Sequence, residues 1–293
     1  MCKKGVKEQK QMRKLVAIDL DGTFLNQYYT ISSLHANTVK KAQQKGAEIV
    51  IATGRANFDV QRLFQNEQLS TWIIGANGAT TYDPKGNLTV ALPMETIYAK
   101  EIITWLNEEN YYYEIVTDNE IFITSKAKQL LQDEMDIVRS ADRSEMERAR
   151  ERQLGQANLQ EIEDYIDVFQ SEKEIYKITI VSFDEERRRV AADTLSKKGL
   201  NLFSSADFNL EIVDGKASKG NALKKLAKKL DVKQDDIIAI GDSMNDLPML
   251  EIAGTKVAMG NATEEVKQHC DYTTETNEKD GVARMLEREI IQK

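Results

Sequence analysis

Cysteine and histidine are scarce in this sequence, with two of each among 293 residues. Cys2 and Cys270 lie at opposite ends of the chain, and His35 and His269 fall in predicted helices, none of them with the spacing of metal ligands. The sequence therefore predicts neither a disulfide framework nor a zinc site. Its low cysteine content favours a protein of the reducing cytoplasm.

Long apolar runs and an excess of positive charge are also missing. No stretch approaches the run of about 18 apolar residues that a membrane span needs, so no span is expected. The first residues are basic but contain no apolar segment, which argues against a signal peptide, and residues 1–13 are predicted to form a flexible extension. The formal net charge of −8 argues against a nucleic-acid-binding surface.

Hydrophobic residues make up 41% of the chain and charged residues 30%, which suits a globular protein with a sizeable core. From residue 15 apolar runs alternate with helical segments: a strand at 15–20, a helix capped by Ser32 or Ser33, and a strand at 47–53. These strands lack polar alternation, which predicts a parallel sheet covered on both faces. Residues 80–93 predict a β-hairpin that turns at 83–86.

The pattern changes after residue 95 and returns near residue 211. The predicted fold class is α/β, with a doubly wound parallel sheet built from residues 14–95 and 211–293 and an α+β domain inserted at 96–210. Within the insertion, the charged run 133–153 is expected to be a solvated helix surface rather than a binding site. The strand that carries Tyr111, Tyr112 and Tyr113 should bury one ring and leave its neighbours more exposed.

Four groups of polar residues follow predicted strands or open the next helix. Asp19 and Asp21 close the first strand, residues 53–55 (Thr-Gly-Arg) follow the second, residues 219–220 (Lys-Gly) open a helix, and residues 242–246 follow a late strand. In open α/β sheets, ligands bind beyond the carboxyl ends of the strands. The four groups are therefore predicted to meet in one crevice.

The charges in that crevice do not balance. Asp19, Asp21, Asp242 and Asp246 bring four carboxylates together, whereas Lys219 supplies one positive charge. Because crowded carboxylates repel one another, a hard divalent cation with oxygen ligands is expected, and Mg²⁺ suits this set better than zinc. Such a site is built for phosphate, with one carboxylate able to attack phosphorus and the other able to act as acid and base.

These ordered motifs, at 19–23, 53–55, 219–220 and 241–246, resemble those of the haloacid dehalogenase-like (HAD) superfamily. The position of the insertion, between the second and third motifs, is similar to the Cof-type subfamily of sugar-phosphate phosphatases (type IIB, with a C2 cap). The resemblance implies a Rossmann-like core, a cap domain that selects the substrate, and Mg²⁺-dependent hydrolysis of small phosphorylated metabolites through an aspartyl-phosphate. Phe24 departs from the family, where an aliphatic residue is usual.

The resemblance also implies individual roles. Asp19 corresponds to the nucleophile and a metal ligand, and Asp21 to the general acid and base, binding Mg²⁺ through its backbone carbonyl. Asp242 corresponds to the third protein ligand of the metal, and Asp246 to a residue that orients Lys219 or a metal-bound water. The residues implied in phosphate binding are Leu20 through its backbone N–H, Thr53, Gly54, Arg55, Lys219 and Asn245.

Some roles stay open at this stage. Arg55 either reaches the substrate or lines the wall of the crevice, and Asn77 either touches the substrate or tolerates a left-handed turn before Gly78. Met244 and Met249 are predicted to fill gaps beneath the fourth motif.

Other functions are compatible with parts of this pattern. A phosphomutase or phosphotransferase would use the same residues, and a regulator that binds sugar phosphates without catalysis would keep the crevice. A phosphoacceptor module of the receiver type also clusters aspartates around Mg²⁺, but such modules are one small domain without an insertion. The expected partner is a small phosphorylated metabolite, with no nucleic acid and no membrane, for a cytoplasmic monomer or homodimer.

Overall fold

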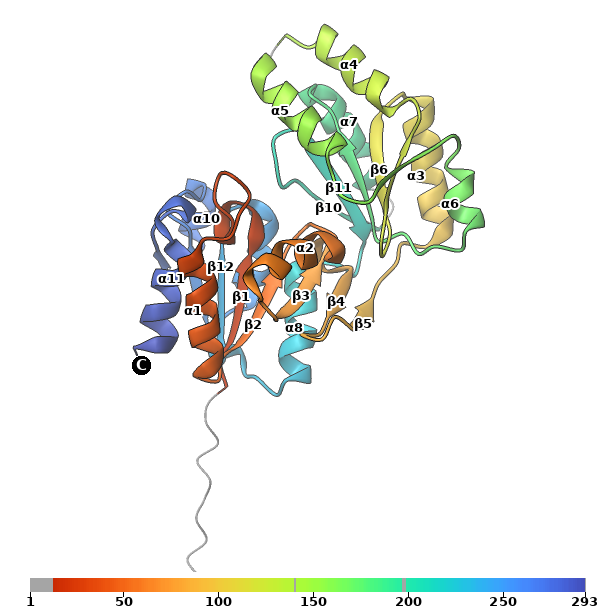
Figure 1. The fold of residues 1–293 in the computed structure, drawn as a ribbon. Helices are drawn as coiled ribbons and strands as arrows, with labels where there is room; N and C mark the ends of the chain where they lie inside the picture. The colour runs from red at the N-terminus through yellow and green to blue at the C-terminus, as the bar shows by residue number, and fades with distance from the viewer. Residues whose placement is uncertain (1–12, 140, 197–198, 293) are drawn as a thin grey trace, which may run out of the picture.

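The computed structural model describes residues 13–139, 141–196 and 199–292, which form two domains joined side by side (Figure 1). The larger, here called the core, holds an eight-stranded sheet, and the smaller, here called the cap, holds a six-stranded sheet. The predicted α/β fold with an inserted second domain is confirmed. The predicted extension at 1–13 lies outside the described residues except for Arg13.

The core sheet has the strand order β14-β13-β12-β1-β2-β3-β4-β5. Its strands from β14 to β3 pair in parallel, while β4 and β5 form the predicted antiparallel hairpin, closed by a hydrogen bond from the N–H of Gly86 to the carbonyl of Asp83. Every residue of β1 and β12 is buried, as their apolar runs predict. The bounds are β1 Leu15–Asp19, β2 Glu48–Ala52, β3 Trp72–Gly75, β4 Thr80–Tyr82, β5 Leu88–Ala91, β12 Ile237–Gly241, β13 Thr255–Ala258 and β14 Tyr272–Thr273.

Helices cover both faces of the core sheet, with α1 packed against α11 and α8 packed against α9 (Figure 1). Helix α1 begins where predicted, since the hydroxyl of Ser32 accepts the N–H of His35 at 3.0 Å and caps its first turn. The bounds are α1 Ser33–Gln44, α2 Asn57–Glu67, α8 Lys219–Lys229, α9 Leu247–Ile252, α10 Glu264–Gln268 and α11 Gly281–Leu286.

The cap sheet has the strand order β10-β11-β9-β6-β7-β8 and is antiparallel except for the pair β7 and β8. Strand β11 pairs within this sheet up to Asp214, so the boundary expected between residues 210 and 211 falls inside a cap strand. The bounds are β6 Tyr112–Val116, β7 Ile121–Thr124, β8 Leu159–Ile162, β9 Lys177–Val181, β10 Leu200–Phe203, β11 Asn209–Asp214, α3 Thr96–Glu108, α4 Ala127–Ile137, α5 Arg143–Leu154, α6 Ile166–Gln170 and α7 Glu185–Leu195.

Helices pack on both faces of the cap sheet around the tyrosines, which changes the expectation for these residues. Tyr111 and Tyr113 pack in a cluster with α3 and α7, and Tyr112 packs on the opposite face with α4 and α5. All three rings are buried, so the prediction that only one would be buried was wrong. Helices on both faces of the strand, rather than on one, are the reason.

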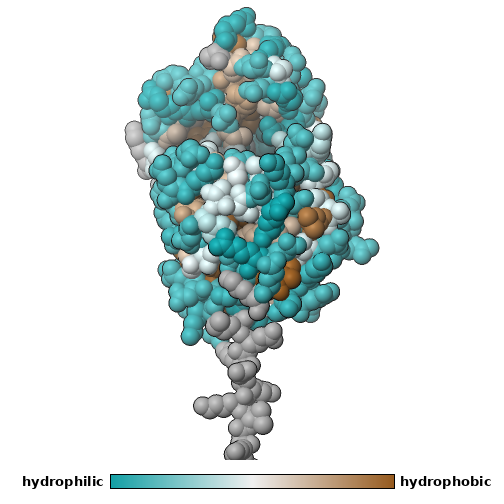
Figure 2. Space-filling view, turned by 90° about the vertical axis from the view of Figure 1, so that its left-hand side faces the viewer, coloured by the Kyte–Doolittle hydropathy of each residue, from teal (hydrophilic) through white to brown (hydrophobic). Residues whose placement is uncertain are grey.

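Hydrophobic residues at the surface are scattered, and the face seen in Figure 2 is largely hydrophilic. None of the helices within the described ranges is long and apolar enough to cross a membrane.

Candidate active site

The four predicted groups of polar residues meet at the carboxyl ends of β1, β2 and β12. Three of the groups line a cavity of about 580 Å³ that is bordered by both domains, and the fourth, through Lys219, lies directly behind it in contact with Asp19. Asp19, Thr53 and Asp242 line it from the core, and Glu114 and Thr179 line it from the cap. This volume lies within the range of small-molecule sites.

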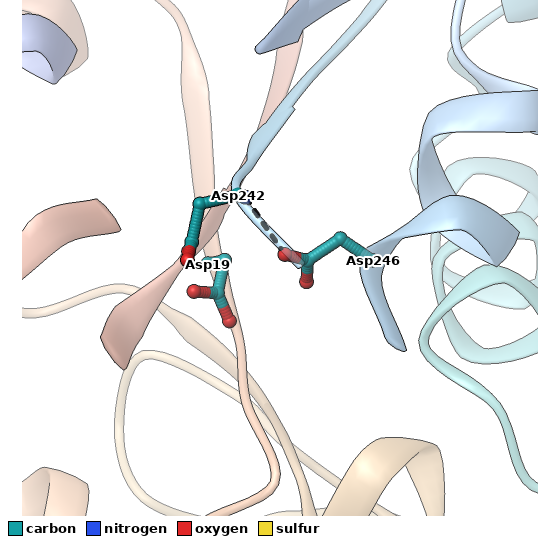
Figure 3. A group of neighbouring side chains, drawn as sticks. All are labelled: Asp19, Asp242 and Asp246. Carbon is teal, nitrogen blue, oxygen red and sulfur yellow. Dashed lines mark hydrogen bonds between the residues drawn. The ribbon is translucent and has the colours of Figure 1, made fainter. Parts of the chain in front are cut away.

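Three carboxylates gather at the core side of the cavity (Figure 3). Oxygen atoms of Asp19, Asp242 and Asp246 lie within 4.8 Å of one another. The ammonium of Lys219 donates to Asp19 Oδ1 and to Asp246 Oδ1, both at 2.6 Å. Although burial disfavours a charged lysine, these two carboxylates raise the pKa of Lys219 and keep it protonated.

Asp246 accepts hydrogen bonds that fix the positions of its neighbours in the cluster. Its Oδ1 accepts from Lys219, while its Oδ2 accepts the backbone N–H groups of Asp242 at 3.0 Å and Ser243 at 3.1 Å. Both oxygens are therefore occupied by protein donors, an arrangement that orients Lys219 and the chain after β12. Met249 is buried beneath this turn as predicted, whereas Met244 is 43% exposed, so its predicted gap-filling role was wrong.

The cluster fits a bound cation. Asp19 Oδ2 is buried without a hydrogen-bond partner in the part of the chain that the structure describes, although its neighbour Oδ1 is bound to Lys219. Burial first, and then the charge of Asp246, raise the pKa of both Asp19 and Asp242 above the ordinary carboxyl range. A divalent cation with oxygen ligands would relieve both the unpaired oxygen and the repulsion between the carboxylates.

Gly22 lets the two motifs approach closely. It adopts a φ of +77°, and a Cβ at this position would lie 2.6 Å from Asp242 Oδ2. The hydroxyl of Thr23 then donates to Asp242 Oδ1 at 2.8 Å. A larger residue than glycine would push Asp242 away from Asp19.

Asp21 points to a different partner. Arg55 binds it with two parallel hydrogen bonds, from Nε to Oδ2 at 2.8 Å and from Nη2 to Oδ1 at 2.6 Å. Burial alone would raise the pKa of Asp21, but the hydrogen bonds and the charge of Arg55 lower it. The sequence left open whether Arg55 reaches the substrate or lines the crevice wall. Its ion pair with Asp21, which joins the first and second motifs, was not predicted.

Hydrogen bonds hold the loop after β2 (residues 53–55) in place, except at the N–H of Gly54. The carbonyl of Thr53 accepts the N–H of Asn77 at 3.0 Å, and the hydroxyl of Thr53 accepts the N–H of Arg55 at 3.1 Å. The N–H of Gly54 has no acceptor among the residues that the structure describes. This N–H is therefore available to an anion in the cavity. Asn245 also lines the cavity, and its Oδ1 accepts from Ser243 Oγ at 3.0 Å.

Two cap residues reach this same loop and were missed from the sequence. Lys177 of β9 donates to the carbonyl of Gly54 at 2.6 Å and also binds Glu211 of β11. Asn77, which does adopt the left-handed conformation with a φ of 52°, donates from Nδ2 to Glu211 Oε2 at 2.8 Å. A Cβ at Gly54 would lie 2.9 Å from Glu211 Oε2. Charged residues inside otherwise apolar strands were the only available signal.

The charged run 133–153 contributes to the cavity as well. It forms α4 and α5, and residues 151–153 at the end of α5 line the cavity wall. Arg152 donates to the hydroxyl of Tyr29 in the core at 2.7 Å. Glu151 and Arg152 are exposed, as expected for a solvated helix surface, but this last turn of α5 also lines the cavity, which the sequence did not predict.

Comparisons with known proteins agree with this geometry. Residues 16–286 match the family described as haloacid dehalogenase-like hydrolase. The chain is 41% identical over 280 residues to phosphatase YwpJ of Bacillus subtilis, covering 93% of this chain and 98% of that protein. It is 36% identical over 280 residues to the B. subtilis 5-amino-6-(5-phospho-D-ribitylamino)uracil phosphatase YwtE, covering 94% and 97%.

The solved structure of a haloacid dehalogenase-like hydrolase from B. subtilis is also similar. It matches with a TM-score of 0.84 at 40% identity, and the match covers 94% of this chain and 99% of that one.

Proposed function

This chain belongs to the haloacid dehalogenase-like hydrolases of subfamily IIB and is a phosphoric monoester hydrolase, and we propose that it is a Mg²⁺-dependent phosphatase of small phosphorylated metabolites that works through an aspartyl-phosphate. The observation that carries the proposal is the state of Asp19. One of its oxygens is bound to Lys219, and the other is buried without a hydrogen-bond partner among the described residues, which suits it to bind a cation or to attack phosphorus.

The metal would be held by the carboxylates of Asp19 and Asp242 and by the backbone carbonyl of Asp21. When bound, Mg²⁺ neutralises these carboxylates and the charge of a phosphate oxygen. The buried cluster supports this set, since Asp246 already has both oxygens occupied by protein donors and serves to orient Lys219.

Asp19 is the nucleophile in the proposed reaction. A carboxylate oxygen of Asp19 bonds to phosphorus while the bond from phosphorus to the leaving oxygen breaks, and Asp21 gives that oxygen a proton. Asp21 then takes a proton from a water molecule that attacks the phosphoryl group, which releases inorganic phosphate and restores Asp19. Arg55 favours the ionised form of Asp21, so protonation of Asp21 for the first step requires that this ion pair loosens.

Phosphate binding is assigned to donors that surround the same point. Lys219 supplies a buried positive charge, and Gly54 supplies a backbone N–H without another acceptor. The backbone N–H of Leu20 and the side chains of Thr53 and Asn245 are proposed to complete the set. Arg55 acts on Asp21 rather than on phosphate in this arrangement.

The substrate is proposed to be small because the cavity is closed by the cap on one side. The name of the B. subtilis relative YwtE states that it acts on a phosphorylated ribitylamino compound, which supports a metabolite with a polar leaving group.

The direct test is phosphate release from p-nitrophenyl phosphate and from a panel of phosphorylated metabolites with Mg²⁺. Asp19→Asn should abolish release while the protein stays folded, as measured by circular dichroism and thermal unfolding. Asp133→Asn, an exposed aspartate on α4, is the matched control and should behave like the parent. Turnover by Asp19→Asn at the parental rate would refute the assignment of the nucleophile.

A further inference from the structure

A row of polar side chains crosses the cap sheet at the roof of the cavity. Thr179 of β9 lies directly opposite Glu114 of β6 on one side and opposite Glu211 of β11 on the other. Residues that are directly opposed on neighbouring strands project from the same face of a sheet. All three are buried, with exposures of 2–4%, and all three line the cavity.

One end of this row is fixed at the phosphate-binding loop. Glu211 is bound by Lys177 and Asn77 and lies against Gly54, where it excludes any larger residue. Neighbouring strands are about 5 Å apart. Thr179 therefore lies one strand spacing, about 5 Å, and Glu114 two spacings, about 10 Å, from the residue that marks the loop. The row therefore acts as a distance scale, because its three members lie at increasing distances from the loop that is proposed to bind phosphate.

The two members of the row beyond Glu211, Thr179 and Glu114, have unused hydrogen-bonding capacity. Thr179 Oγ1 is buried and has no hydrogen-bond partner within residues 13–139, 141–196 and 199–292. Both hydrogen bonds that Glu114 accepts, from Tyr112 Oη and Gln156 Nε2 at 2.7 Å each, end on Oε1, and its Oε2 accepts none from the described residues. For Thr179, leaving this buried hydroxyl without a partner costs free energy, so a ligand that supplies the partner gains affinity. Glu114 Oε2 offers an acceptor on the same lining of the cavity.

We propose that Thr179 and Glu114 bind hydroxyl groups of the leaving group, Thr179 the hydroxyl nearer the phosphate and Glu114 one further along, so that the substrate is a phosphate ester of a chain carrying several hydroxyls. A hydroxyl suits both positions, since Thr179 can donate or accept and the carboxylate of Glu114 accepts. Hydrogen bonds from Tyr112 and Gln156 fix the position of the Glu114 carboxylate. This inference rests on the proposed phosphatase activity and adds a length and a chemistry to its substrate.

A series of substrates tests the scale on the unmodified protein. The substrates are ethyl phosphate, glycerol 3-phosphate and sorbitol 6-phosphate, with p-nitrophenyl phosphate as the reference for the phosphoryl site. With Mg²⁺ present, kcat/KM should rise about tenfold from ethyl phosphate to glycerol 3-phosphate and about tenfold again to sorbitol 6-phosphate, one step for each hydroxyl bound.

Two variants assign each step to a residue. Thr179→Val should lower kcat/KM for both polyol phosphates about tenfold relative to that for p-nitrophenyl phosphate. Glu114→Gln should lower the value for sorbitol 6-phosphate at least tenfold relative to that for glycerol 3-phosphate, because only the longer chain reaches it. A glutamine at this position can still accept from Tyr112 and Gln156, so the cap is expected to fold.

Matched controls are available outside the cavity. Thr81 is also a buried threonine whose Oγ1 has no partner among the described residues, and Glu134 is a buried cap glutamate bound by Ser182 Oγ at 2.5 Å. Thr81→Val and Glu134→Gln should leave the ratios between substrates unchanged. These controls separate loss of a binding group from a general effect of the substitution type.

Three outcomes would overturn the scale. The first is a parent that gains no rate from added hydroxyls, which applies even if a variant fails to fold. The second is unchanged substrate ratios in both Thr179→Val and Glu114→Gln. The third is an equal loss for short and long substrates in Glu114→Gln. By contrast, a parent that releases no phosphate from any of these esters would refute the proposed phosphatase function itself.

Discussion

The core and the cap each bury one lysine between oxygen atoms within the described ranges, but the two lysines serve different ends. Lys219 of the core binds Asp19 and Asp246 of its own domain. Lys177 of the cap binds Glu211 of its own sheet and the carbonyl of Gly54 in the other domain. One lysine balances charge where the chemistry is proposed, and the other joins the domains at the phosphate loop.

The charge around each lysine explains the difference. Lys177 and Glu211 form a balanced pair, which Asn77 completes with a neutral donor. Lys219 stands among three carboxylates and cannot neutralise them. The core site therefore has a surplus of negative charge that a further cation would balance, whereas the charges of the cap pair balance each other. The comparison shows that burial of a lysine is compatible with either a structural or a catalytic arrangement, and that the surplus charge distinguishes the two.

The largest effect is expected from Lys219→Met. It removes the only cation of the described cluster and a proposed phosphate ligand, so kcat/KM for p-nitrophenyl phosphate should fall by about 10³-fold. The measurement is steady-state phosphate release at saturating Mg²⁺. A loss of less than tenfold would remove the contrast between the two lysines.

Lys177→Met should act mainly on stability. It leaves Glu211 buried without a cation, which is expected to lower the free energy of unfolding by about 3–5 kcal/mol in urea denaturation. The double variant Lys177→Met with Glu211→Gln should recover at least half of that loss, since no unpaired charge remains. Lys173→Met is the control, because its pair with Glu120 is 36% and 32% exposed and is worth about 1 kcal/mol or less.

Substitutions of two core aspartates, Asp242 and Asp21, are expected to change the affinity for Mg²⁺ to different extents. Asp242→Ala removes a proposed carboxylate ligand and should weaken Mg²⁺ activation at least about tenfold. Asp21→Asn should slow turnover with little change in the Mg²⁺ concentration for half activation, since its proposed contact is the backbone carbonyl. Titration of activity with Mg²⁺ measures both. Equal losses of affinity in the two variants would argue against that backbone contact.

The smallest effect is expected at the exposed contact between the domains. Arg152→Ala breaks the hydrogen bond to Tyr29, which lies at the surface, so unfolding stability should change by about 0.5 kcal/mol or less. Thermal unfolding measures this change. A loss as large as that of Lys177→Met would mean that the exposed contact joins the domains as strongly as the buried one.

The core site could be largely predicted from the sequence because its residues follow strand ends. Asp19, Thr53 and Asp242 each come directly after an apolar run, and the carboxyl ends of parallel strands meet at one edge. Lys219 opens the helix that follows the insertion and reaches the same edge. The position of each of these residues depends on the residues next to it in the chain, and a single sequence shows those directly.

The pairing of Arg55 with Asp21 could not be predicted in the same way. Both residues were placed in the crevice, but the sequence does not tell which of several nearby anions a long side chain binds. The prediction for the three tyrosines was wrong for a related reason, because their exposure depends on whether helices cover one face of the strand or both.

The sequence by itself determined the element order, the interruption of the core by a second domain, and the cluster of acids at the strand ends, because these follow from apolar periodicity and from residues adjacent in the chain. Only the tertiary structure decided that Lys177 and Glu211 reach Gly54, and that Glu114 and Thr179 stand in one row above it. Those relations depend on strand register and on the docking of the cap, where a shift of one residue would turn every side chain to the other face.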